Sequence, residues 1–220
     1  MQDNNKNNNK VENINNIPNP FRLTKFYDTV DDINKLPENS ICEIAIIGRS
    51  NAGKSSLLNT LTDQHKLAFT SKMPGRTQHI NYFSIANKEG VFLIDLPGYG
   101  YAKVPEKIRV KWSFLLGSYL HDREQLYGLI LIMDARHPLK ELDYKMLECV
   151  KFTNRKLHIV LSKSDKLTYQ ESLKTIKFVK EQLDINAYKN YTIQLFSSLK
   201  KTGMSELLTC LNLWLTEIDA

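Results

Sequence analysis

The sequence predicts an α/β doubly wound fold, in which a mostly parallel sheet carries helices on both of its faces. Two observations support this prediction. Apolar runs rich in β-branched residues alternate with stretches of helical periodicity, as successive strand and helix units require. Two of the runs, 80–86 and 91–95, are separated only by the tetrapeptide NKEG, which predicts one antiparallel hairpin. The sheet should therefore be six-stranded and mostly parallel, with one antiparallel strand.

The individual elements follow from composition and periodicity. Strands are predicted at 41–47, 80–86, 91–95, 126–134, 157–162 and 191–197. Helices are predicted near 54–62, 105–120, 139–152, 169–183 and 203–217, and Pro105 and Pro138 stand where a first helical turn tolerates proline. The longest apolar run, LYGLILIMDA, is too short to span a bilayer and is better explained as a buried strand.

The first twenty residues differ in composition from the rest of the chain. Asparagine fills eight of the first 17 positions, and such a segment cannot bury enough apolar surface to offset its ordering entropy. We expect residues 1–20 to form a disordered tail and residues 21–220 to form a single domain. Between Phe21 and Leu36, apolar residues are spaced as if a strand or a short helix packs on that domain.

Composition and charge narrow the class of protein. With 42% apolar and 25% charged residues, the chain should fold as a globular domain, and its net charge of +6 favours an anionic partner. Cys42, Cys149 and Cys210 are widely separated, which indicates reduced residues of a cytoplasmic protein. We expect no membrane and no DNA among the partners. Nothing in the sequence requires more than a monomer.

The segment GRSNAGKSS, which begins at Gly48, fits the phosphate-binding pattern GxxxxGK(S/T) through Gly53, Lys54 and Ser55. In this pattern backbone amides wrap phosphates at a helix N-terminus, the lysine reaches the terminal phosphates, and the serine hydroxyl binds Mg²⁺. A strand is predicted before the match and a helix after it, which is the context that the motif demands. A glycine-rich turn without a ligand is the less favoured alternative.

Two further segments follow in the order expected of a GTPase. DLPG, at 95–98, comes at the end of a strand, where Asp95 can hold the magnesium shell and the Gly98 amide can sense the terminal phosphate. SKSD, at 162–165, also ends a strand. Asp165 can accept hydrogen bonds from the ring N–H and the exocyclic amine of guanine, which adenine cannot supply together. Together, the segments DLPG and SKSD therefore indicate that the chain binds a guanine nucleotide, GTP or GDP.

Two weaker segments complete the predicted site. FSSLKKTG follows the last strand, and Ser197 and Ser198 can contact the guanine oxygen, although a capped helix start remains an alternative. Between the phosphate loop and DLPG lies TSKMPGRTQHINYF, where Thr77 can bring its hydroxyl to magnesium only when the terminal phosphate is present. We expect Lys54, Thr77 and Gly98 to act on the reacting phosphate. The expected metal ligands are Ser55, Thr77 and Asp95.

Taken in order, GRSNAGKSSLLN, PGRTQ, DLPGYGYA and FSSLKK resemble the signature of the EngB (YihA/YsxC) family of ribosome-associated GTPases, within the TrmE-Era class. The resemblance covers the chain from about Phe21 to its C-terminus and implies a Ras-like P-loop GTPase fold. The nucleotide contacts that it implies fall on Gly48, Arg49, Ser50, Asn51, Ala52, Gly53, Lys54, Ser55, Gly75, Arg76, Thr77, Gln78, His79, Asp95, Leu96, Pro97, Gly98, Ser162, Lys163, Ser164, Asp165, Phe196, Ser197 and Ser198.

The resemblance also implies a function. It points to a GTP-dependent switch that assists assembly of the large ribosomal subunit or its precursor, through ribosomal RNA and ribosomal proteins, and that is needed for normal cell division and septation. Three alternatives stay open: a nucleotide-regulated binding scaffold, a membrane-traffic or signalling GTPase, and an ATP-hydrolysing P-loop enzyme. The lack of a C-terminal lipidation motif disfavours a membrane-traffic or signalling GTPase. Asp165, which fits guanine better than adenine, disfavours an ATP-hydrolysing enzyme.

Two residues bear on the rate of hydrolysis. Tyr99 occupies the position after DxxG where Ras-type enzymes carry a water-orienting glutamine, so we expect slow intrinsic hydrolysis, on the order of 10⁻² to 10⁻⁴ per second, with a partner completing the site. Asn51 can help to place K⁺ beside the phosphates, as asparagine does in TrmE-Era relatives, or can merely shape the loop. The two interpretations of Asn51 carry equal weight.

Overall fold

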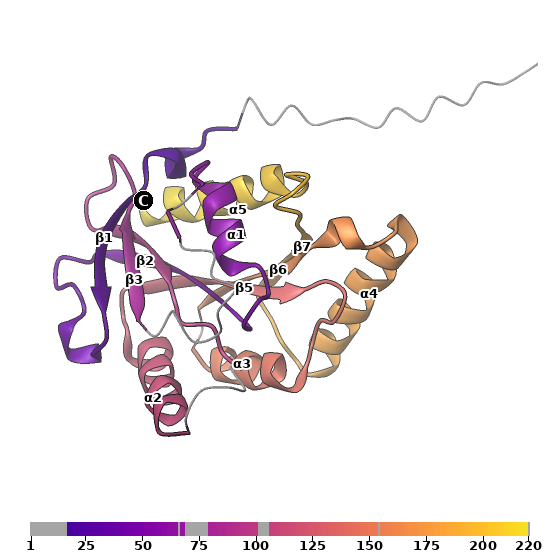
Figure 1. The fold of residues 1–220 in the computed structure, drawn as a ribbon, viewed down its shortest axis with the longest axis horizontal. Coiled ribbons are helices and arrows are strands. Elements are labelled where there is room, and N and C mark those ends of the chain that lie inside the picture. Colours follow the sequence, from indigo (N-terminus) through magenta and orange to yellow (C-terminus); the bar gives the residue numbers. More distant parts are fainter. Residues whose placement is uncertain (1–16, 66, 69–78, 101–105, 154, 220) are drawn as a thin grey trace, which may run out of the picture.

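The computed structural model describes residues 17–65, 67–68, 79–100, 106–153 and 155–219. Within these residues, seven strands form one sheet in the order β1-β3-β4-β2-β5-β6-β7 (Figure 1). The strands are β1 (Lys25–Val30), β2 (Cys42–Gly48), β3 (Ile80–Ser84), β4 (Val91–Asp95), β5 (Leu126–Asp134), β6 (Lys156–Ser162) and β7 (Tyr191–Leu195). The α-helices are α1 (Lys54–Leu61), α2 (Glu106–Asp122), α3 (Glu141–Lys151), α4 (Tyr169–Ile185) and α5 (Met204–Ile218). Short 3₁₀ helices are η2 (Pro20–Leu23), η3 (Ile33–Lys35) and η4 (Ser164–Lys166).

The predicted α/β fold is confirmed, with one strand more than expected. Strand β3 pairs antiparallel with both β1 and β4, whereas the other neighbouring strands pair parallel. Among the strands that the structure describes, β3 is therefore the one that runs against the rest. The seventh strand is β1, a segment that the sequence left open as a strand or a short helix. Five of its six residues are exposed. An edge strand of this kind lacks the apolar alternation by which strands are recognised in a sequence.

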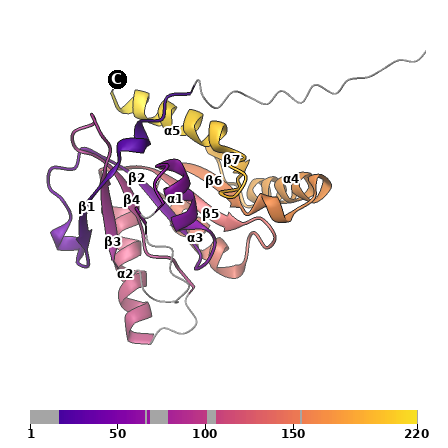
Figure 2. The same ribbon diagram turned by 45° about the horizontal axis from the view of Figure 1, so that its top comes forward.

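Helices lie on both faces of the sheet (Figure 2), and an apolar layer fills the space on each face. Strand β2 is buried along its whole length and supplies both layers, because successive side chains of a strand point to opposite faces. Ala45 and Ile47 face the layer that contains residues of α2, α3 and α4, while Ile44 and Ile46 face the layer that contains residues of α1 and α5. Strand β2 is thereby held rigidly at the centre of the domain.

Ile17, the first residue that the structure describes, already contacts the domain, four residues before the boundary expected at Phe21. Ile17 packs against the layer of α1 and α5. The side chain of Asn19 donates a hydrogen bond to the Leu61 carbonyl oxygen at 2.9 Å and accepts one from the Phe21 amide at 3.0 Å. The apolar and asparagine side chains here therefore have defined partners. Residues 1–16, most of the expected tail, lie outside the described residues.

The parallel pairing brings the ends of several strands to one edge of the sheet. In the register of the sheet, Ile46 of β2 lies beside Asp95 of β4, Gly48 lies beside Ile132 of β5, and Asp134 of β5 lies beside Ser162 of β6. In open α/β sheets, ligands bind outside the carboxyl ends of the strands.

In the described part of the chain, no helix is long and apolar enough to cross a membrane.

Candidate nucleotide site

The loop 49–53 joins β2 to α1 and depends on two glycines, Gly48 immediately before it and Gly53 at its end. A Cβ atom at Gly48 would lie 2.7 Å from the backbone oxygen of Ile132, so β5 leaves no space for a side chain. Gly53 has a φ of 106° and Asn51 a φ of 61°, both in the left-handed region. The loop therefore turns tightly and delivers the chain to the N-terminus of α1, where free backbone amides favour anions.

A buried ion pair joins this loop to the neighbouring strand. Lys54 is the first residue of α1, Asp95 is the last residue of β4, and the lysine ammonium group donates to the aspartate carboxylate. The exposed fractions are only 9% for Lys54 and 3% for Asp95. A buried lysine and a buried carboxylate at the start of an α-helix form a site that can hold phosphate on one side and a divalent cation on the other.

The end of β6 supports the same loop from the other side. Nζ of Lys163 donates to the Asn51 carbonyl oxygen at 2.6 Å and to Oδ2 of Asp134 at 2.9 Å. The hydroxyl of Ser162 donates to the Ala52 carbonyl oxygen. Ser162, which the sequence placed among the nucleotide contacts, thus faces the loop that precedes α1. Three sequence-distant segments therefore meet at one point.

Asp165 is oriented by the segment that follows β7. Oδ1 of Asp165 accepts a hydrogen bond from the Ser197 hydroxyl at 2.7 Å, and this bond lowers the pKa of the carboxyl group from its ordinary value. The Ser164 amide donates to the Phe196 carbonyl oxygen at 3.1 Å, which ties the two segments together. The Asp165 side chain is only 7% exposed, and its Oδ2 atom lies 3.5 Å from Nζ of Lys166. An ionised carboxylate can accept several hydrogen bonds, so Asp165 can accept two N–H groups of a guanine base.

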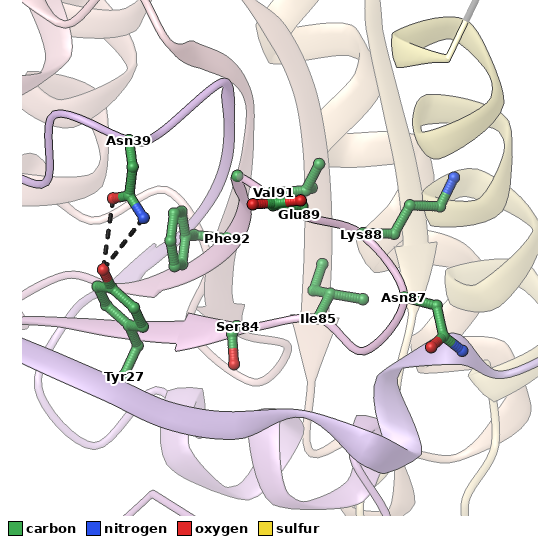
Figure 3. A pocket seen from close by; sticks show the side chains of 10 residues that line it. Tyr27, Asn39, Ser84, Ile85, Asn87, Lys88, Glu89, Val91 and Phe92 are labelled. Carbon is green, nitrogen blue, oxygen red and sulfur yellow. Dashed lines mark hydrogen bonds between the residues drawn. The ribbon is translucent and has the colours of Figure 1, made fainter.

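A separate hollow lies at the opposite end of β4 from Asp95 (Figure 3). It has a volume of about 510 Å³ and lies between β1 and the turn that joins β3 to β4. The rings of Tyr27 and Phe92 contact each other with centroids 4.8 Å apart and planes tilted by 55°, and Asn39 donates to the Tyr27 hydroxyl at 3.1 Å. This hollow is distinct from the loop 49–53 and from Asp165.

Comparison with known proteins identifies the family. The family described as "50S ribosome-binding GTPase" matches residues 43–163. The probable GTP-binding protein EngB of Neisseria meningitidis serogroup B is 53% identical over 203 residues, which cover 92% of this chain and 96% of that protein. The chain belongs to the EngB family of GTP-binding proteins. As a member of this family with the GTPase domain, it is a GTP-hydrolysing enzyme.

Solved structures show that this EngB-family chain shares its fold with other GTPases. The crystal structure of a probable GTP-binding protein EngB is 20% identical, has a TM-score of 0.64, and is matched over 80% of this chain and 100% of that chain. Era in complex with MgGDPNP and nucleotides 1506–1542 of 16S ribosomal RNA is 22% identical, with a TM-score of 0.63 and coverage of 79% of this chain and 56% of that chain.

The structure brings most of the predicted site residues of the EngB-family chain to one edge of the sheet. The segments 48–55, 95–98, 162–165 and 196–198 meet there through the contacts described above. The side chains of Ala52, Leu96, Pro97 and Phe196 are buried, so only their backbone can face a ligand. His79 is exposed and immediately precedes β3. Gly75, Arg76, Thr77 and Gln78 lie outside the described residues.

Sequence reasoning missed two carboxylates that hold the site of this EngB-family chain. Asp134 binds Lys163, and its position at the end of the strand predicted at 126–134 was the signal that could have found it. Asp143 of α3 accepts a hydrogen bond from the Tyr99 hydroxyl at 2.8 Å and lies 3.9 Å from Nε of Arg49. Burial, with the Asp143 charge next, raises the pKa of Tyr99, so the hydroxyl stays protonated.

Proposed function

We propose that this protein is a GTP-dependent switch that assists assembly of the large ribosomal subunit, and that cell division and septation depend on it. The observation that carries the proposal is the match of residues 43–163 to a family described as 50S ribosome-binding GTPase. In this chain the proposed phosphate loop also contacts the proposed guanine-recognition segment, through Lys163 and Asn51. The 16S ribosomal RNA bound by Era supports an RNA-containing partner for this fold. The proposed compartment is the cytoplasm, and the proposed functional unit is the monomer.

The proposed nucleotide pose assigns one task to each segment. Backbone amides of 49–53 and the ammonium group of Lys54 bind the phosphates, and Asp165 binds the guanine edge. Ser55 and Asp95 fit Mg²⁺, because this cation prefers hydroxyl and carboxylate oxygens and takes few ligands from the protein beside substrate phosphates. When bound, Mg²⁺ would neutralise charge on the phosphate oxygens. Thr77 and the Gly98 amide are the proposed sensors of the terminal phosphate.

Hydrolysis by the isolated protein should be slow. The Tyr99 hydroxyl points to Asp143 on α3, and a hydroxyl engaged there does not orient water at the phosphate. We expect an intrinsic rate on the order of 10⁻² to 10⁻⁴ per second, raised by a partner that completes the site. A single-turnover rate near 10 per second for the protein alone would contradict this expectation.

A second proposal concerns the binding of a monovalent cation at the same loop. Asn51 is exposed and has a left-handed backbone, while its carbonyl oxygen is held by Lys163. Its side chain can therefore either help to place K⁺ beside the phosphates or only shape the loop. Equal rates of GTP hydrolysis in potassium and in sodium salts would favour the second role.

Co-sedimentation tests the ribosomal role. The protein is loaded with GDP or with a nonhydrolysable GTP analogue and is centrifuged with purified large or small subunits at two salt concentrations, because salt weakens nonspecific attraction to RNA. We expect binding to the large subunit alone, in the triphosphate state, that survives the higher salt. Asp165→Asn lacks the second carboxylate oxygen that would accept from guanine, so its binding to the large subunit should no longer depend on which nucleotide is added. Equal binding to both subunits with either nucleotide would contradict the proposal.

The same particles separate the switch from its main alternative. A switch that is driven by hydrolysis should turn over GTP faster when large subunits are added, whereas a nucleotide-regulated scaffold should bind them without a change in rate. A multiple-turnover phosphate-release assay with and without large subunits decides between these outcomes. Small subunits at the same concentration serve as the control for nonspecific effects of RNA.

A further inference from the structure

We infer that Asp134 is a positioning residue for guanine-nucleotide binding, which acts by holding Lys163 against the phosphate loop. The inference rests on the proposed assignment of 49–55 and Asp165 to the nucleotide. It concerns a residue that lies outside every nucleotide motif in the sequence. Asp134 would contact no part of the nucleotide itself. Its effect would pass through the Lys163 side chain to the loop that surrounds the phosphates.

The first support is the set of contacts around Asp134. The residue ends β5 and has an exposed fraction of 6%. Oδ2 accepts hydrogen bonds from Nζ of Lys163 at 2.9 Å and from Nη2 of Arg136 at 2.7 Å. Oδ1 accepts from Nε of Arg136 at 2.9 Å and from its backbone amide at 3.1 Å. Both oxygens are therefore occupied, and the carboxylate has a fixed orientation.

The second support is that Lys163 is shared between Asp134 and the loop. Its ammonium group also donates to the Asn51 carbonyl oxygen at 2.6 Å. The backbone of Lys163 has a φ of 59°, which is unfavourable for a residue with a side chain and must be held by its surroundings. Asp134 supplies the charge that keeps the ammonium group at this position. Without it, the exposed lysine head group would gain freedom to move into solvent.

The third support is that the backbone around the pair is rigid. Asp134 and Ser162 lie side by side in the register of β5 and β6, and the Ala135 amide donates to the Ser162 carbonyl oxygen at 2.8 Å. The Ser162 hydroxyl is bonded to the Ala52 carbonyl oxygen, next to the Asn51 carbonyl that Lys163 holds. Adjacent carbonyl groups of the loop are thus held from β6. A loop held in its bound shape loses less conformational freedom when a ligand binds.

The charge state of Asp134 is consistent with this role. Burial alone would raise the pKa of the carboxyl group, but hydrogen bonds from Arg136 and Lys163 outweigh burial and hold the pKa well below its usual range. Asp134 is therefore ionised at neutral pH. Replacing it with asparagine removes the charge, keeps the size, and leaves one oxygen to accept from Lys163.

The test is the dissociation constant and dissociation rate of a fluorescent GDP analogue, measured for four variants beside the wild type. The variants are Asp134→Asn, Lys163→Met, the double variant, and Glu141→Gln, an exposed carboxylate 2.6 Å from Lys145 on α3. Asp134→Asn should raise the dissociation constant about tenfold, mainly through faster dissociation, because a charge-assisted hydrogen bond is lost. Glu141→Gln should bind GDP as the wild type does.

The double variant separates positioning from a general structural role. If Asp134 acts through Lys163, adding Asp134→Asn to Lys163→Met should change the dissociation constant less than twofold. Additive effects, or unchanged GDP binding by folded Asp134→Asn, would overturn the inference. Thermal unfolding without nucleotide checks the fold of each variant, and Asp134→Ser replaces Asp134→Asn if the latter does not fold. Wild-type binding of GDP that is lost in Asp165→Asn shows that the nucleotide assignment stands independently of Asp134.

Discussion

Replacing Arg123 with methionine should destabilise the domain strongly, because Arg123 neutralises a carboxylate at the base of the sheet. Glu43 of β2 has an exposed fraction of 0%. Its Oε1 atom accepts hydrogen bonds from Nη2 of Arg123 at 2.6 Å, from Nε of Arg123 at 3.0 Å and from the Tyr82 hydroxyl at 3.2 Å. Its Oε2 atom accepts from the Tyr119 hydroxyl at 2.5 Å. The cluster thus connects β2, β3 and the end of α2.

The size of the effect follows from what remains after the substitution. Both tyrosine hydroxyls can still donate to Glu43, but the carboxylate keeps its negative charge without a cation beside it. Removing one partner of a buried ion pair costs about 3–5 kcal/mol. For a domain of this size, about 1 kcal/mol shifts the melting temperature by about 2–4 °C, so the expected loss is about 6 to 20 °C.

Urea unfolding at pH 7 without nucleotide measures the loss. The double variant with Glu43→Gln and Arg123→Met should recover part of it, because the uncompensated charge is gone. Lys145→Met, which removes an exposed partner of Glu141, is the control and should leave the midpoint unchanged. A loss below about 1 kcal/mol in Arg123→Met would show that Glu43 is solvated or neutral, and the reasoning would fail.

Three further predictions concern the site and its support. Gly48→Ala should weaken GDP binding at least about tenfold, since the new Cβ would meet the Ile132 oxygen at 2.7 Å; wild-type affinity in a titration would argue that the loop yields without cost. Tyr99→Phe should change the single-turnover rate of GTP hydrolysis less than about threefold, as its hydroxyl faces Asp143; a loss of about a hundredfold would mean that Tyr99 acts on the reaction. Burial lowers the pKa of His158 in the folded state. Below about pH 6.5 the unfolded chain therefore binds a proton at this residue that the folded protein does not bind. The free energy of unfolding then decreases as the pH falls towards the pKa of the folded state. His158→Gln should show a smaller loss of urea stability between pH 7.5 and 5.5, and equal losses would refute this explanation.

The nucleotide segments were predictable because each one is local in sequence. The backbone geometry of Gly53, the placement of Lys54 at a helix start, and the placement of Asp95 at a strand end are set within a few residues. Their order along the chain then implied a common edge of a parallel sheet. Ser162 was expected among the nucleotide contacts, whereas its hydroxyl is bonded to the Ala52 carbonyl oxygen of the loop. A motif specifies where a residue lies in the fold but not which neighbouring group its side chain will hydrogen-bond.

The sequence by itself determined the doubly wound fold and the family, and it located the loop 49–53 and Asp165, which we propose bind the nucleotide. Only the tertiary structure decided which carboxylates support them. Asp134 and Lys163 are 29 residues apart, Tyr99 and Asp143 are 44 apart, and Glu43 and Arg123 are 80 apart. Strand β1 likewise became visible only through its pairing with β3. The physical reason is that hydrogen bonds and ion pairs act over a few ångströms in space, and no periodicity or spacing in a sequence records which distant residues the packed sheet brings within that range.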